Sequence, residues 1–122
     1  MYTFKLDQYK VNGAVCVLAY LDGELLGKLS SYVPTRLEPN EFAAKTYSEN
    51  ASWAPEVLAL PHFIDTGEVV VASDVTWPIY ELSLEFIKEQ FEATYNKSKD
   101  IYEAPTFLWD LYEKYVGEVW RT

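Results

Sequence analysis

The sequence predicts an α+β fold in which an antiparallel sheet of about five or six strands precedes two helices. Three observations support this prediction. Residues 2–31 contain an alternating segment, an apolar run and two pairs that favour hairpin turns. Residues 53–60, bounded by a proline, are typical of one short central helix. Residues 84–95 and 105–116 repeat apolar side chains at helical spacing, and we expect these two C-terminal helices to pack on one face of the sheet.

The chain has the length and composition of a single folded domain. Its 122 residues are 49% apolar and 16% aromatic, which is enough to form a core and unlike a disordered segment. We therefore predict one domain over residues 1–122. Residues 1–82 are expected to be mainly β with one short helix, and residues 83–122 to form a helical extension.

The first third of the chain is typical of consecutive antiparallel strands. Residues 2–7 alternate in polarity, as in a half-buried strand, and Asn12-Gly13 tolerates the positive φ of a tight turn. Residues 14–21 are apolar on both faces, which predicts a central strand. Asp22-Gly23 is a second turn pair, after which residues 25–31 are expected to return as a third strand.

The middle of the chain predicts a short strand, a short helix and two further strands. Residues 41–46 are expected to form a short fourth strand. For the helix at 53–60, Ser52 is the expected cap, Pro55 fits only its first turn and Pro61 ends it. Residues 68–72 and 77–82 predict two further strands. Because Pro78 has no N–H to donate, its strand is expected to be an edge strand or to begin at the proline.

Two helices are expected in the last third. Ser83 is the predicted cap of a helix at 84–95. A second helix, with Pro105 in its first turn, is expected to end near Gly117.

The charge is distributed unevenly along the chain. The formal net charge is −9, and residues 1–45 are neutral, with five acids and five bases. Residues 46–87 contain seven acids and neither lysine nor arginine. Direct binding to nucleic acid or to an anionic membrane is disfavoured, because both require clustered basic residues. A basic protein is the favoured partner, and solubility alone is the alternative explanation of the acidity.

The sequence favours a cytoplasmic protein. The longest apolar run has eight residues, Ala14–Leu21, whereas a membrane-spanning helix needs about twenty. The N-terminus does not resemble a signal peptide. The single cysteine, Cys16, lies within the apolar run and is expected to be a buried free thiol in a reducing compartment.

Residues suited to catalysis or cofactor binding are few. His62 is the only histidine and lacks obvious partners for a metal, so a structural or surface role is expected. The five glycines are scattered, and none belongs to a phosphate-binding loop. We therefore expect no catalytic residues, no metal and no cofactor. An enzyme that uses two of the nineteen carboxylates stays open as an alternative.

The aromatic residues suggest either a packed core or an interface. Tyrosine and tryptophan are enriched at protein interfaces, so Trp53 and Trp77 are candidates beside the acids of the middle segment. The predicted partner-binding residues are Glu49, Glu56, Asp65, Glu68, Asp74, Glu81, Trp53 and Trp77. A homodimer or accessory subunit that assembles through the aromatic C-terminal helices is the alternative.

A family resemblance covers about residues 12–82. The stretch Asn40-Glu41-Phe42-Ala43-Ala44-Lys45-Thr46-Tyr47-Ser48-Glu49-Asn50 resembles the "NEFFVKDYSEN" signature of the small acidic proteins classed as domain of unknown function 4313. Phe63-Ile64-Asp65-Thr66-Gly67 and Trp77-Pro78-Ile79-Tyr80-Glu81-Leu82 follow in the same order as in that family, and residues 83–122 have no counterpart. The resemblance implies an accessory or anti-defence protein of a mobile element or phage. It carries over no functional residues.

Overall fold

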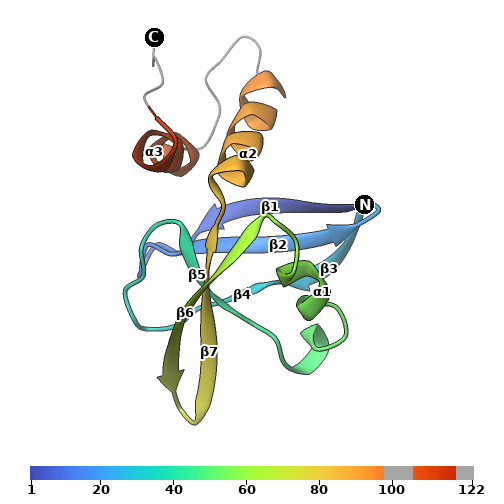
Figure 1. Cartoon of the computed structure of the whole chain (residues 1–122), viewed down its shortest axis with the longest axis vertical. Helices are drawn as coiled ribbons and strands as arrows, with labels where there is room; N and C mark the ends of the chain where they lie inside the picture. The colour runs from blue at the N-terminus through green and yellow to red at the C-terminus, as the bar shows by residue number, and fades with distance from the viewer. Residues whose placement is uncertain (98–105, 118–122) are drawn as a thin grey trace. The chain divides into compact units, whose positions relative to one another are not determined.

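The computed structural model describes residues 1–97 and 106–117, and it confirms an α+β fold (Figure 1). The chain divides into two compact units, Met1–Glu81 and Leu82–Thr122. Within the described residues, seven strands form a three-stranded and a four-stranded sheet, so the predicted strands belong to two sheets. In these described ranges, no helix has the length and apolar character needed to cross a membrane.

The first sheet has the order β1-β2-β3, with strands Tyr2–Gln8, Val15–Leu21 and Glu24–Lys28. The apolar strand β2 lies in the middle, as predicted, with Val15, Val17 and Ala19 almost fully buried. Asp22 and Gly23 both have positive φ, 51° and 87°, and form the predicted two-residue turn between β2 and β3.

Asn12 and Gly13 do not form a tight two-residue turn. They lie in the longer loop between β1 and β2, where Gly13 has a φ of 76°. The buried Asn12 side chain explains the difference, because it stabilises this longer loop. Its Nδ2 donates to the Val33 carbonyl at 2.9 Å, and its Oδ1 accepts from the Ala14 amide at 3.0 Å.

The predicted third strand is divided between the two sheets. It ends as β3 at Lys28 and resumes as β4, Ser30–Ser31, in the second sheet. Leu29, between them, is fully buried and donates its amide to the Val17 carbonyl at 2.8 Å. The pairing of β2 with β3 shifts register between Ala19 and Tyr20. Such a bulge bends a strand pair, and sequence periodicity does not reveal it.

The second sheet has the order β4-β5-β7-β6, with β5 at Glu41–Ala44, β6 at Phe63–Ala72 and β7 at Val75–Leu82. The prediction for Pro78 was wrong, because β7 is an inner strand and begins three residues earlier. Its pairing with β5 ends at Ala43↔Ile79. Pro78 lies just beyond this last pair, where no partner in β5 needs its missing N–H.

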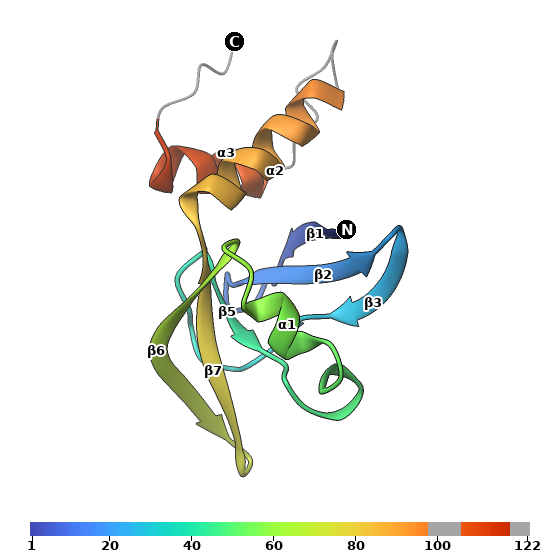
Figure 2. The same ribbon diagram turned by 45° about the vertical axis from the view of Figure 1, so that its right-hand side comes forward.

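Strands β6 and β7 form a hairpin that extends beyond the first sheet in both views (Figures 1 and 2). Its two-residue turn, Ser73-Asp74, has positive φ at both positions, 50° and 66°. Strand β6 starts at Phe63 and is longer than the predicted 68–72. Gly67, with a φ of 80°, interrupts the regular backbone inside it, which is typical of a bulge.

The short helix α1 spans Ala54–Leu58 and follows the 3₁₀ turn η1 at Ser48–Asn50. Ser52 is not its cap. The capping position is Trp53, which makes no capping side-chain hydrogen bond, and Pro55 lies in the first turn as predicted.

The second unit contains helices α2, Leu84–Lys97, and α3, Thr106–Tyr115. Ser83 Oγ accepts from the Phe86 amide at 3.2 Å, which confirms the predicted cap. The centroid of the Phe91 ring lies 4.9 Å from that of Trp109, which it meets edge-on, and 4.6 Å from that of Tyr112. Aromatic packing therefore joins the two helices. Pro105 lies outside the described residues.

Candidate functional site

The eight predicted partner-binding residues fall into two groups. Glu49, Trp53 and Glu56 lie in or beside η1 and α1. The other five belong to the β6–β7 hairpin: Asp65 and Glu68 on β6, Asp74 in the turn, and Trp77 and Glu81 on β7. All the acids are exposed except Glu81, which is half-buried.

The two acids of the first group interact with other parts of the fold. The ammonium group of Lys45 pairs with the Glu49 carboxylate, and this hydrogen bond is the main reason why the pKa of Glu49 is lowered. Desolvation is the main cause that raises the pKa of the Tyr2 phenol, and the neighbouring Glu56 carboxylate raises it further. Lys45 lies one residue before the segment without bases, so local charge counting did not reveal this pairing.

The hairpin acids make no ion pair within the described part of the chain. Asp65 accepts from the Gly67 amide at 2.9 Å, an Asx-type contact at the residue whose φ is positive. Glu81 lies directly opposite Glu41 in the register of β5 and β7. Like charges opposite each other destabilise a strand pair, so a cationic group near this pair would relieve repulsion.

The charge of the hairpin also affects Tyr80 on β7. Desolvation is the main cause of the raised pKa of its phenol, and the negative charge of Asp65 raises it further. Its ring stacks on Phe42 of β5, with the two centroids 6.3 Å apart. The inner part of the hairpin is therefore fixed to the core, whereas Asp65, Glu68 and Asp74 are exposed to solvent.

The two tryptophans are partly used by the fold. Trp77 Nε1 donates to the Tyr47 hydroxyl at 3.3 Å, and its ring packs beside the cluster of Val33, Ala43 and Ile79. Trp53 lies against Gly27, where an added Cβ would be 3.2 Å from Trp53 Cζ2. Both side chains are half-buried, so each leaves only part of its ring for a partner.

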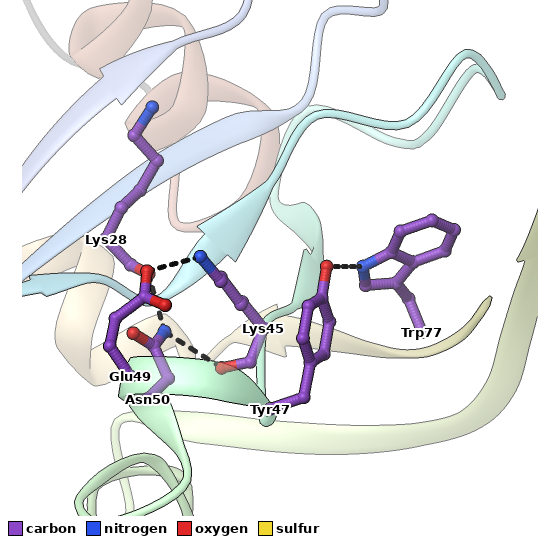
Figure 3. A network of polar contacts seen from close by, with 6 residues as sticks. All are labelled: Lys28, Lys45, Tyr47, Glu49, Asn50 and Trp77. Carbon is purple, nitrogen blue, oxygen red and sulfur yellow. Dashed lines mark hydrogen bonds and ion pairs between the residues drawn. The ribbon is translucent and has the colours of Figure 1, made fainter.

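Sequence reasoning missed the residue that organises this region, Asn50 (Figure 3). Its side chain is 1% exposed, and Nδ2 donates to the carbonyls of Lys28 at 2.8 Å and Lys45 at 3.0 Å. Lys28 ends β3 of the first sheet, and Lys45 follows β5 of the second. Asn50 thus links the two sheets. In the sequence, Asn50 is marked by its position at the end of the Asn40–Asn50 stretch that resembles the family signature.

The sequence contains one histidine and one cysteine, and both lie in the part of the chain that the structure describes. The His62 ring lies 5.4 Å from the Phe4 ring and 6.0 Å from the Phe63 ring. Cys16 was expected to be buried but is only half-buried, because it lies on the less covered face of β2. Among the residues that the structure describes, no three His, Cys, Asp or Glu side chains are grouped to hold a metal ion.

Comparisons with models of known protein families, with curated proteins and with solved structures found no match to this chain. The arrangement of its own residues therefore carries the functional argument. Two features matter most. The acids of the β6–β7 hairpin make no ion pair with a described residue, and the inner part of the hairpin is fixed to the core by the stacking of Tyr80 on Phe42.

Proposed function

We propose that the chain is a non-enzymatic protein that binds a basic macromolecule through the β6–β7 hairpin. The supporting observation is that Asp65, Glu68, Asp74 and Glu81 lie on one hairpin and form no ion pair with any described lysine or arginine. A cationic partner would gain Coulomb attraction there without first breaking an internal salt bridge.

The proposal gives different weight to the two groups of acids. Glu49 already pairs with Lys45 and therefore contributes less to a new charge contact, and Glu56 lies on the short helix α1, away from the hairpin acids in the sequence. The hairpin acids and the exposed part of Trp77 are therefore the proposed binding residues. An accessory or anti-defence role in a mobile element or phage, in the cytoplasm, is part of the proposal and is supported by the family resemblance alone.

A titration with an oligolysine peptide tests the charge component. Binding should weaken from about 0.01 M to about 1 M salt, because the Debye length falls from about 30 Å to about 3 Å. The variant Glu68→Lys/Asp74→Lys should bind about tenfold more weakly at low salt, since each lost pair contributes up to about 1 kcal/mol and is replaced by repulsion.

The matched control is Asp7→Lys/Glu24→Lys, which reverses two exposed acids of the first sheet. Both variants have a formal net charge of −5, because each exchange adds two charges to −9. If the control loses as much affinity as the hairpin variant, net charge alone explains the binding and the proposed site is wrong.

A further inference from the structure

Strand β6 is the terminal strand of the second sheet, and its outer edge has no strand partner within residues 1–97 and 106–117. At ten residues it is the longest strand described. A terminal strand exposes a row of backbone N–H and C=O groups that can pair with another chain. The other end of this sheet, β4, has only two residues, so β6 is the edge with room for an additional strand.

The side chains of β6 favour such pairing. Ile64, Val69 and Val71 are 45%, 57% and 66% exposed, and all three are β-branched. Proteins commonly protect an exposed edge with lysine or proline. Strand β1, at the edge of the first sheet, places the exposed Lys5 and Asp7 outward, but β6 contains neither lysine nor proline.

From these features we infer that the outer edge of β6 binds an extended, cationic segment of a partner protein as an additional β-strand. This inference rests on the proposed function and specifies where and how the basic partner binds. Backbone hydrogen bonds would provide the pairing, Val69 and Val71 the apolar contacts, and the hairpin acids the preference for lysine or arginine.

Charge decides between this occupant and a second copy of the chain. Pairing two β6 strands would bring together two hairpins, each with the four carboxylates Asp65, Glu68, Asp74 and Glu81 and no base. Like charges brought together in this way oppose association. A strand that alternates apolar and basic side chains would instead place one set on Val69 and Val71 and the other near the acids.

The irregular backbone at Gly67 limits how long the paired segment can be. Gly67 has a φ of 80°, and the contact of Asp65 with its amide holds the chain in this irregular form. The regular part of the edge is therefore Glu68–Ala72, which ends at the Ser73-Asp74 turn. We expect the partner to contribute a short strand that is centred on these residues.

The test uses the full chain, labelled with ¹⁵N, and a capped peptide of alternating lysine and valine. A control peptide of equal charge has proline in place of its central valines, so it cannot form a continuous ladder. We expect hydrogen exchange of amides within Glu68–Ala72 to slow at least about tenfold with the first peptide. The proline peptide should bind about tenfold more weakly.

A variant pair tests the apolar contacts without changing charge. Val69→Thr/Val71→Thr should weaken binding of the lysine–valine peptide several-fold, whereas Val11→Thr should not. Val11 is the matched control, because it is 82% exposed but lies in the β1–β2 loop. Threonine keeps the β-branch, so the hairpin retains its strand preference.

The outcomes separate this inference from the proposed function. If both peptides bind equally in a salt-dependent way and the β6 amides gain no protection, the acidic site stands but strand addition is wrong. If protection of Glu68–Ala72 depends on protein concentration and not on peptide, a second copy occupies the edge and the inference is also wrong. If neither these peptides nor oligolysine bind, the proposed function itself fails.

Discussion

Replacing Asn50 tests whether one buried amide links the two sheets. Its Nδ2 makes two hydrogen bonds, to the Lys28 and Lys45 carbonyls, from a side chain that is 1% exposed. Each hydrogen bond contributes about 1 kcal/mol, and a carbonyl left without a donor costs about 1–3 kcal/mol when buried, with the lower end applying to these two part-buried bonds. The Asn50→Ala variant should therefore lose about 2–4 kcal/mol of unfolding free energy.

Asn50→Asp separates hydrogen bonding from packing. Aspartate has nearly the same shape, but its carboxylate has no proton to donate and would face two carbonyl oxygens. We expect it to destabilise the protein at neutral pH at least as much as alanine does, and part of the loss to be recovered when acid protonates the carboxylate.

Urea unfolding, followed through amide signals of β2 and β5, measures both variants in the unit that contains Asn50. Signals of α2 and α3 serve as an internal reference, because the second unit lacks this contact. An Asn50→Asp variant as stable as the native chain at neutral pH would refute the reasoning, since shape alone would then account for the role of Asn50.

The β6–β7 turn and Tyr9 give two further predictions. The variant Ser73→Asn/Asp74→Gly should raise the unfolding free energy by about 0.5–1 kcal/mol, because Ser73 and Asp74 have φ values of 50° and 66° that asparagine and glycine adopt more easily. Thermal unfolding measures this change, and a lower melting temperature would contradict the prediction. Burial is the main cause that raises the pKa of Tyr9 from 10.0 to about 12. The folded state therefore holds the Tyr9 proton more tightly than the unfolded state. The contribution of Tyr9 to the unfolding free energy should be fully present below pH 10 and should be lost as the pH rises towards 12. We expect a loss of about 1 kcal/mol, because solvent reaches the half-buried ring and reduces the effect. Urea unfolding of Tyr9→Phe should lack this part of the alkaline loss, and an unchanged profile would refute the assignment.

The fold class was predictable because the periodicity of the sequence agrees with the strands and helices that form. Alternation in residues 2–7, the apolar run that contains β2 and the Asp22-Gly23 pair each act over a few residues. The division of one predicted strand into β3 and β4 was not predictable. It depends on a register shift in the pairing of β2 with β3 and on the burial of Leu29, which only the assembled sheets produce.

The candidate site was predictable in composition but not in arrangement. Counting charges located the acidic segment, since a segment without bases is visible in the sequence. The pairing of Glu49 with Lys45 and the effect of Glu56 on the pKa of the Tyr2 phenol depend on the fold. The start of β6 was missed because Asp65-Thr66-Gly67 is typical of a turn. In the structure, Thr66 Oγ1 donates to the Ile79 carbonyl at 2.7 Å within the hairpin.

The most direct test of the acidic hairpin as a binding site is the ratio of two dissociation constants for oligolysine at low salt. One is that of Glu68→Lys/Asp74→Lys, and the other is that of Asp7→Lys/Glu24→Lys, which has the same net charge. We predict that the hairpin variant binds about tenfold more weakly than the first-sheet variant. A ratio near one would show that the position of the carboxylates does not matter, and it would contradict the proposed function.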